Sequence, residues 1–241
     1  MKESIDNQIL ILKKAGLYCP AGNFYIDPRG KVDRALITHA HSDHARSGHE
    51  KYLCTDSCKA LLQIRIGERN KIESLPFGQS QTIGDARVSF HPAGHILGSA
   101  QIRIEVGGRV WVVSGDYKPQ PDRTAEPFEL VTCDGFISEC TFGLPVYRWR
   151  PEEEIYEQIN RWWEGNKNEG HGSLIFAYSL GKAQRVLSGL DASLGPIYAH
   201  SAVHPFLKHY QNAGVTLPEV KKIENEKDFS GAMVIAPPAV E

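Results

Sequence analysis

The stretch THAHSDH, residues 38–44, carries four potential metal ligands within six residues, directly after a short apolar segment. In an extended chain, residues i and i+2 point the same way, so His39 and His41 can bind one metal ion together. If the chain then turns, Asp43 and His44 can face a second ion. Zinc prefers nitrogen and oxygen donors of this kind. A polar loop that is rich in histidine by chance is the alternative, but the chain has only ten histidines. The stretch therefore predicts a two-metal site at a strand end.

Two further donors follow predicted strands later in the chain. His95 lies in HPAGHILGSA (91–100), and Asp116 lies in SGDY (114–117) after an apolar run. A glycine precedes each of them, which lets the backbone turn sharply toward a metal ion. Alone, each is an ordinary loop residue, but beside residues 38–44 they predict the remaining ligands.

The bulk properties fit a water-soluble globular protein. The chain has 241 residues, of which 41% are hydrophobic, and a net charge of −2. This length suits one large α/β domain or slightly more. The small charge means that a phosphate-rich partner would be met by a local patch or by metal ions. No run of eighteen apolar residues predicts a membrane span, and residues 1–16 lack a signal-peptide pattern. We therefore expect no membrane association and a cytoplasmic location.

The five cysteines are odd in number and scattered, so a disulfide framework is not expected in a chain of this length. Cys54 and Cys58 are four residues apart, a spacing that can place two thiolates on one helix face. No second pair matches them, so buried reduced thiols are favoured over a zinc knuckle.

The first part of the chain is predicted to be rich in strands. Residues 8–27 read as a short hairpin with a turn at 19–22. A helix is expected over 56–67, with Asp56 or Ser57 as its cap. Further strands are expected at 35–37, 88–90, 100–106, 110–113 and 136–137.

The second part alternates helices and strands. Pro151 followed by three glutamates is typical of a helix start, because proline fits the first turn and acids favour the positive end of the helix dipole. Strands are expected at 174–177, 196–199 and 232–236, and helices at 180–190 and 202–213. This alternation predicts a parallel sheet and a second α/β unit.

The ligand pattern of residues 39–44, His95 and Asp116 resembles that of the metallo-β-lactamase superfamily. The strings at 93–100 (AGHILGSA) and 138–143 (SECTFG) more specifically resemble the β-CASP nucleases. GLYCPAG with FYIDP, within residues 16–28, is similar to the bacterial DNA ligase-associated exonucleases. The implied α/β fold is an incomplete metallo-β-lactamase αββα sandwich over 1–145, followed by a β-CASP-like parallel α/β domain over 146–241.

The resemblance implies two zinc ions, with Mn²⁺ as an alternative. It also implies that Asp27 orients the histidine loop, that Glu139 hydrogen-bonds a ligating histidine, and that Asp43 orients or deprotonates the attacking water. Each of these two acidic residues also has a non-functional interpretation. Asp27 could simply be a turn residue before Pro28, and Glu139 could be a solvated residue at a strand end. The implied ligands are His39, His41 and His95 for the first zinc, Asp43 and His44 for the second, and Asp116 bridging both.

The segment YSLGKAQ (178–184) resembles a β-CASP strand-to-helix loop. Its exposed amides and the side chain of Lys182 could hold a substrate phosphate, with Ser179 and Gly181 in the same loop. The alternative is a plain helix that Ser179 caps. The histidines at 91, 200, 204 and 209 follow no metal-ligand spacing and are interpreted as ordinary residues.

The sequence departs from the β-CASP pattern after residue 236, where the family has a further zinc ligand and returning lactamase strands. This difference predicts an under-ligated second zinc site and reduced activity. The leading hypothesis is a zinc-dependent DNA exonuclease linked to DNA repair or ligation, with nucleic acid as its partner and a functional link to an ATP-dependent DNA ligase and a helicase. An RNA-processing nuclease and an inactive fragment that only binds are the alternatives. A small-molecule hydrolase is disfavoured, because such enzymes lack the segment from Glu139 onward.

Overall fold

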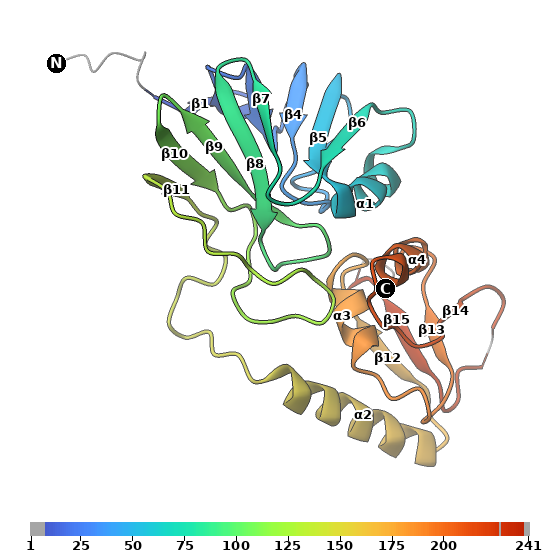
Figure 1. The fold of residues 1–241 in the computed structure, drawn as a ribbon. Coiled ribbons are helices and arrows are strands. Elements are labelled where there is room, and N and C mark those ends of the chain that lie inside the picture. Colours follow the sequence, from blue (N-terminus) through green and yellow to red (C-terminus); the bar gives the residue numbers. More distant parts are fainter. Residues whose placement is uncertain (1–7, 227, 239–241) are drawn as a thin grey trace. The chain divides into compact units, whose positions relative to one another are not determined.

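The computed structural model describes residues 8–226 and 228–238. The chain divides into two compact units, Met1–Glu139 and Cys140–Glu241, called here the first unit and the second unit. Each is described by itself. Both contain helices and strands, so the predicted mixed α/β class is confirmed (Figure 1).

The first unit contains two sheets. The six-stranded sheet runs in the order β1-β2-β3-β4-β5-β6, and the five-stranded sheet in the order β11-β10-β9-β8-β7. The strands β3 to β6 are parallel, and most other pairs are antiparallel. In chain order the elements are β1 (Ile11–Lys13), β2 (Gly16–Cys19), β3 (Phe24–Ile26), β4 (Arg34–Leu36), β5 (Lys51–Thr55), α1 (Asp56–Ile66), β6 (Ile72–Leu75), β7 (Ser80–Ile83), β8 (Ala86–Pro92), β9 (Ala100–Val106), β10 (Arg109–Val113) and β11 (Gly135–Ile137).

The two sheets share one hydrophobic core. Alternate residues of β3, such as Phe24 and Ile26, and alternate residues of β8 and β9, such as Phe90, Ile102 and Ile104, are buried in the same cluster. This period of two is the pattern expected when each sheet buries one face. The core fixes the strand ends, from which the functional residues project.

Three features of the first unit differ from the sequence-based expectations. Residues 8–27 form two hairpins rather than one, because the chain turns at residues 14–15 and Gly16 adopts a φ of +131°. The cap of α1 is Thr55, whose hydroxyl accepts a hydrogen bond from the Cys58 amide. The strands β5, β6 and β7 were not predicted, because their short segments lack a clear apolar alternation.

The second unit contains a four-stranded parallel sheet in the order β12-β15-β13-β14. The predicted parallel sheet is therefore confirmed, and α2 begins at Glu152 after Pro151 as expected. The buried Trp163 of α2 and Leu187 of α3 belong to a core with Ile197 and Ile235. The elements are α2 (Glu152–Asn168), β12 (Ser173–Phe176), α3 (Lys182–Ser188), β13 (Ile197–Ala199), α4 (His204–Asn212), β14 (Lys221–Lys222) and β15 (Met233–Ala236).

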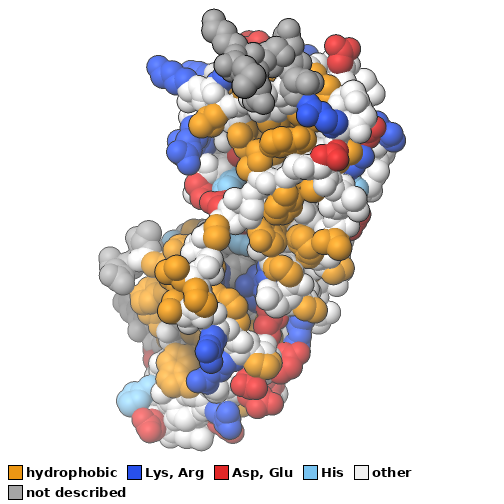
Figure 2. All heavy atoms as spheres, turned by 90° about the vertical axis from the view of Figure 1, so that its left-hand side faces the viewer, with side chains coloured by type: hydrophobic (Ala, Val, Ile, Leu, Met, Phe, Trp, Pro, Cys, Tyr) orange, Lys and Arg blue, Asp and Glu red, His pale blue; other side chains and the backbone are white. Residues whose placement is uncertain are grey.

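The segment between β11 and α2 carries exposed rings that contact one another. The Phe142 ring makes edge-to-face contacts with Tyr147 and Trp149, and all three are about half exposed or more. Figure 2 shows hydrophobic side chains exposed on the face that it presents. Among the residues described, no helix is long and apolar enough to cross a membrane.

Candidate metal centre

The histidine loop begins at the carboxyl end of β4 and closes in a tight turn. The amides of His44 and Ala45 both donate to the carbonyl of His41, at 3.2 and 2.8 Å. The Ala100 amide donates to the Thr38 carbonyl at 2.8 Å, which ties this loop to the start of β9 in the other sheet. The chain thus turns between His41 and His44, which is the condition under which Asp43 and His44 were expected to face a second ion.

The other potential ligands come from the five-stranded sheet. His95 follows β8, Asp116 follows β10 and Glu139 follows β11. Because β10 and β11 are parallel neighbours, Asp116 and Glu139 leave adjacent strand ends. The strands β8 and β10 both pair antiparallel with β9, so their carboxyl ends lie at one edge of the sheet. Topology therefore gathers residues that are far apart in the sequence.

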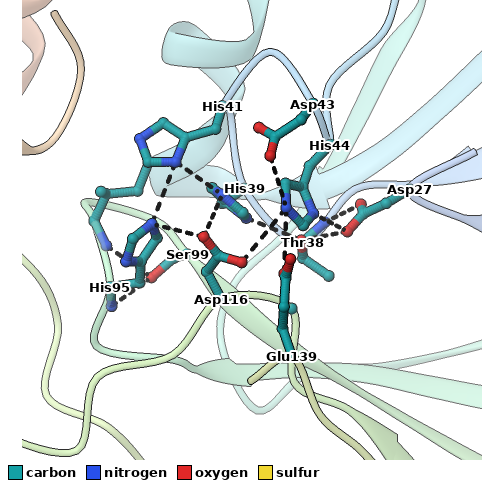
Figure 3. A network of polar contacts seen from close by, with 12 residues as sticks. Asp27, Thr38, His39, His41, Asp43, His44, His95, Ser99, Asp116 and Glu139 are labelled. Carbon is teal, nitrogen blue, oxygen red and sulfur yellow. Dashed lines mark hydrogen bonds and ion pairs between the residues drawn. The ribbon is translucent and has the colours of Figure 1, made fainter. Parts of the chain in front are cut away.

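Four of the predicted ligands converge in a first donor cluster (Figure 3). The Nδ1 atom of His41 lies 3.1 Å from His39 Nε2 and 3.2 Å from His95 Nε2. The Oδ2 atom of Asp116 lies 3.4 Å from His95 Nε2 and 3.9 Å from His39 Nε2. Three ring nitrogens and one carboxylate oxygen therefore face one small volume.

A second donor cluster adjoins the first and shares Asp116 with it. The Nε2 atom of His44 lies 3.5 Å from Asp116 Oδ1 and 3.5 Å from Glu139 Oε2. Asp43 approaches this cluster through His44, at 3.6 Å from the same nitrogen, and its side chain is 72% exposed. Glu139 was expected to hydrogen-bond a ligating histidine, but it lies among the potential ligands. Asp43 was expected to be a ligand, but it lies at the edge of the cluster.

The hydrogen bonds of Asp27 decide which ring nitrogens are free to bind a cation. The Thr38 hydroxyl donates to Asp27 Oδ2 at 2.6 Å, so its oxygen accepts from Nδ1–H of His39 at 3.1 Å. Asp27 Oδ2 also accepts from Nδ1–H of His44 at 2.8 Å. Nδ1 of both histidines is therefore held as a hydrogen-bond donor, so Nε2 is the atom that would present a lone pair to a bound cation.

The charges of the centre shift several pKa values. Burial lowers the pKa of His39 well below its usual range, and the neighbouring histidines lower it further. Burial also disfavours the charged form of His44, but its contacts with Asp116 and Asp27 outweigh this and raise its pKa to about 10. The pKa of Glu139 rises to about 7, because its protonated form is favoured beside Asp116 and because it is partly buried. The His44 position therefore strongly favours positive charge.

Two observations show that these residues fit metal ions. The nitrogen separations of 3.1 and 3.2 Å around His41 are close to the about 3.3 Å expected between ligands of a tetrahedral zinc ion with bonds of about 2.0–2.1 Å. In addition, Oδ1 of Asp116 is buried and has no hydrogen bond among the described residues, its ion-pair contact being His44 Nε2 at 3.5 Å. A buried carboxylate oxygen without a partner is costly unless a cation faces it.

Glycine is required before two of these residues. Gly94, which precedes His95, has a φ of +74°, and a Cβ there would clash with the Lys118 carbonyl oxygen. Gly115, which precedes Asp116, has a φ of +54°, and a Cβ there would lie 2.7 Å from the Thr38 side chain. The close packing of Gly115 on Thr38 links Asp116 to the histidine loop.

Two supporting residues were missed by the sequence analysis. Thr38 connects Asp27 to His39, and the Ser99 hydroxyl accepts from the amides of His95 and Ile96 at 3.0 and 3.1 Å. Both are small hydroxyl residues within four positions of a histidine, which is the signal that could have found them.

The predicted phosphate loop lies in the second unit. α3 begins at Lys182 with Gly181 as its cap, so the alternative interpretation, in which Ser179 caps this helix, is wrong. The Gly181 amide donates to the Gln184 side chain at 2.7 Å, and that side chain donates to the Ser179 carbonyl. The Gly181 amide, expected to meet a phosphate, therefore already has a partner. Phosphate binding by this loop stays a prediction.

The remaining histidines and the cysteines form no further group of potential metal ligands within the described ranges. His91 hydrogen-bonds to Ser89 and Glu129, at 3.0 and 2.9 Å. All five cysteines are free. Cys54 and Cys58 are buried as expected, and Cys19 is buried as well, whereas Cys133 is half-buried and Cys140 exposed.

Comparison with known proteins gives several relatives, although no protein-family model matches the chain. The chain is 33% identical to "Probable DNA ligase" from Opitutus terrae, over 92% of this chain and 22% of that protein. It is 29% identical to "Endoribonuclease ysh-1" from Neurospora crassa, over 68% of this chain and 23% of the relative. It is 28% identical to "Transcription termination factor FttA" from Thermococcus kodakarensis, over 69% of this chain and 31% of the relative.

A solved structure shares the fold. A protein of unknown function from Enterococcus faecalis V583 matches with a TM-score of 0.57 and 11% identity, over 84% of this chain and 58% of that one. The chain spans only 22 to 31% of the length of the three relatives named above. Over two thirds or more of its own length, the chain is thus a homologue of proteins named as a DNA ligase, an endoribonuclease and a transcription termination factor.

Proposed function

We propose that this chain is a zinc-dependent phosphodiesterase of the β-CASP branch of the metallo-β-lactamase superfamily, acting on nucleic acid. The observation that carries the proposal is the pair of adjoining donor clusters that share Asp116. A relative named as an endoribonuclease supports the same class of reaction. In this proposal residues 1–145 form the lactamase-type domain and residues 146–241 the β-CASP-like domain.

When bound, two metal ions would supply Lewis-acid activation of a phosphodiester. The chain's part is to present neutral histidines and ionised carboxylates at fixed separations, and the Asp27 hydrogen bonds serve this purpose. The proposed ligands are His39, His41, His95 and Asp116 for the first zinc, and His44, Asp116 and either Glu139 or Asp43 for the second.

Two carboxylates at the second cluster can handle protons. Asp43 is largely exposed and lies 3.6 Å from His44 Nε2, so it can orient an attacking water and accept its proton. Glu139, with a pKa of about 7, can hold or release a proton near neutral pH. Whichever of the two carboxylates does not bind the second metal ion is thus free to accept or release a proton.

We favour DNA as the substrate and exonucleolytic cleavage as the reaction, with a link to ligation or repair. The relative named as a DNA ligase, whose match covers 92% of the chain, supports DNA and the link to ligation. Exonucleolytic cleavage rests on the resemblance of residues 16–28 to the ligase-associated exonucleases. An RNA-processing nuclease is the second candidate, because another relative is named as an endoribonuclease. Discrimination between the two rests on contacts to the 2′-hydroxyl.

The loop around Lys182 is proposed as a phosphate contact in the second unit. Its Nζ atom lies 5.7 Å from the centroid of the Tyr178 ring, so a cation and a half-exposed aromatic ring are presented together. A strand of nucleic acid offers partners for both, a phosphate and a base.

The decisive experiment combines metal analysis with a nuclease assay. Zinc and manganese are measured in the purified chain, which is then given single-stranded DNA and RNA of one sequence, each labelled at the 5′ or the 3′ end. We expect up to two metal ions per chain and stepwise shortening of DNA from one end. Internal cuts in RNA would favour the second candidate.

The matched variant is His95→Ala, which removes one donor of the first cluster and leaves the second intact. We expect loss of cleavage and retention of the fold. Cleavage that persists in this variant and in the presence of a chelator would contradict the proposal.

A further inference from the structure

A pocket of about 260 Å³ lies in the first unit, away from the metal centre. Its walls come from β1, β2 and β3 and from the segment that leads into β4. Three of its residues are cations (Lys13, Lys31 and Arg34), two are tyrosines (Tyr18 and Tyr25), and one is a carboxylate, Asp33. None of the donors of the metal centre lines it.

The two tyrosines form a paired aromatic surface. Tyr18 and Tyr25 face each other across β2 and β3, with ring centroids 4.7 Å apart. Because Phe24 and Ile26 point into the core, Tyr25 between them lies on the opposite face of the sheet. The Tyr18 hydroxyl donates to Asn23 at 2.8 Å, which fixes its ring. Lys13 Nζ lies 3.4 Å from the Tyr18 ring centroid.

The charge of the pocket is positive, since three cations stand against one carboxylate. Among the residues that the structure describes, neither Lys31 nor Arg34 forms an ion pair, so both charges are available to an external anion. A whole-chain charge of −2 makes this local excess distinctive. Cations beside aromatic rings are the combination that binds single-stranded nucleic acid, because the cations bind its phosphates and the rings stack on its bases.

The pocket and the metal centre lie at opposite ends of the same strand. Arg34 begins β4, and His39 follows its carboxyl end. Five extended residues span about 17 Å. A stacked nucleic-acid strand advances about 3.4 Å per nucleotide, so about five stacked nucleotides would span this distance.

We propose that this pocket is a second nucleic-acid contact, in which Lys31 and Arg34 bind backbone phosphates and Tyr18 and Tyr25 stack on a base. The inference rests on the proposed function for its ligand and adds a site that sets affinity rather than cleavage. The pocket's ligand is a single strand longer than about four nucleotides, whereas the metal centre needs only one phosphodiester.

The test is the salt dependence of binding, measured with a chelator present so that cleavage plays no part. A fluorescent twenty-nucleotide single-stranded DNA, and RNA of the same sequence, are titrated with the 241-residue chain at several salt concentrations. For Lys31→Ala and Arg34→Ala we expect weaker binding, and a slope of log K against log salt that falls by about 0.7 for each cation removed. In the double variant the slope should fall by about twice as much as in either single variant.

Lys71→Ala is the matched control, because Lys71 is exposed and precedes β6 at the other edge of the same sheet. It should leave the slope unchanged. Tyr18→Phe keeps the ring and should bind like the unmodified chain, whereas Tyr25→Ala should bind more weakly with its slope unchanged. Thermal unfolding of each variant confirms that the fold is retained.

The proposal is overturned if the double variant keeps the original slope, if Lys71→Ala loses as much, or if the unmodified chain binds neither strand. Hydrolysis of bis(p-nitrophenyl) phosphate with added zinc separates this result from the proposed function. Pocket variants should hydrolyse this small phosphodiester at the unmodified rate. A chain that binds strands through the pocket but never hydrolyses the small ester would refute the proposed function alone.

Discussion

The Nδ1 nitrogen of His44 lies 2.8 Å from Oδ2 of Asp27, although the residues are 17 positions apart. The contact forms because β3 and β4 are parallel neighbours, so that the residues after each strand meet at one sheet edge. Asp27 adopts a φ of +41°, a conformation that aspartate and asparagine tolerate better than most residues. This backbone aims one carboxylate at Thr38 and at His44.

We predict that Asp27→Asn weakens metal binding by about 10- to 100-fold. The backbone conformation suits asparagine, but one of the two acceptor oxygens becomes an NH₂ group that cannot accept from Thr38 or His44. Competition against a fluorescent zinc chelator measures the affinity. Asp85→Asn, in the exposed turn before β8, is the control. Equal affinities in the two variants would show that Asp27 does not set the histidine tautomers.

Asp116→Asn should impair both metal sites, because each of its oxygens faces a different cluster. His95→Ala should impair only the first site and His44→Ala only the second. The first cluster offers three histidine nitrogens and the second only one, so we expect the first zinc to bind more tightly. Calorimetric titration of zinc into chelator-treated protein resolves the two. Two equally tight sites that survive Asp116→Asn would exclude a shared carboxylate.

Gly115→Ala should destabilise the first unit more than Gly107→Ala does. Both glycines have positive φ, +54° and +57°, so both variants carry a conformational cost of about 1–2 kcal/mol. Only at Gly115 would the added Cβ meet the Thr38 side chain, which adds about 1–3 kcal/mol of overpacking. Urea unfolding gives the difference in the free energy of unfolding. If both variants lost the same free energy of unfolding, the Thr38 side chain would have to move away from the added Cβ without an energetic cost.

Thiol labelling should divide the five cysteines into reactive and protected groups. Cys140 is exposed and Cys133 half-buried, whereas Cys19, Cys54 and Cys58 are buried. Burial raises the pKa of Cys19, and the neighbouring Cys54 together with burial raises that of Cys58, so fewer thiolates are available there. Mass spectrometry after brief alkylation should find label at Cys140 first, and at the buried three only in denaturant. Early modification of Cys58 would contradict the structure.

The sequence predicted the members of the first donor cluster better than those of the second. His39 and His41 alternate along an extended segment, and this local geometry survives in any fold that has a strand there. The roles of Asp43 and Glu139 depend on how tightly the chain turns and on where β11 ends. Both are tertiary properties, and the structure brings Glu139 nearer the cluster than the spacing of residues 39–44 suggested.

The parallel sheet of the second unit was predictable, because short, almost wholly apolar segments alternate with segments of helical periodicity. The strands β6 and β7 were not, since four-residue segments with two or three polar members resemble a loop. The capping of α3 was also missed. The side chain of Gln184 accepts a hydrogen bond from the Gly181 amide, whereas the alternative interpretation had Ser179 as the cap. Side chains that fold back on the preceding loop compete with nearer hydroxyl groups for the backbone amides at a helix start. Sequence spacing does not decide which of the two forms the hydrogen bond.

The donors of the metal centre are divided between two sheets. The histidine loop follows β4 of one sheet, whereas His95, Asp116 and Glu139 follow strands of the other. An ion held by both sets would cross-link the two layers at one edge and close a loop of some fifty residues or more between His41 and His95. Its binding energy would then resist separation of the layers, contributing about 4 kcal/mol when the free ion is a thousandfold above its dissociation constant. Stripping the ion should therefore lower the melting temperature of the first unit and leave that of the second unchanged.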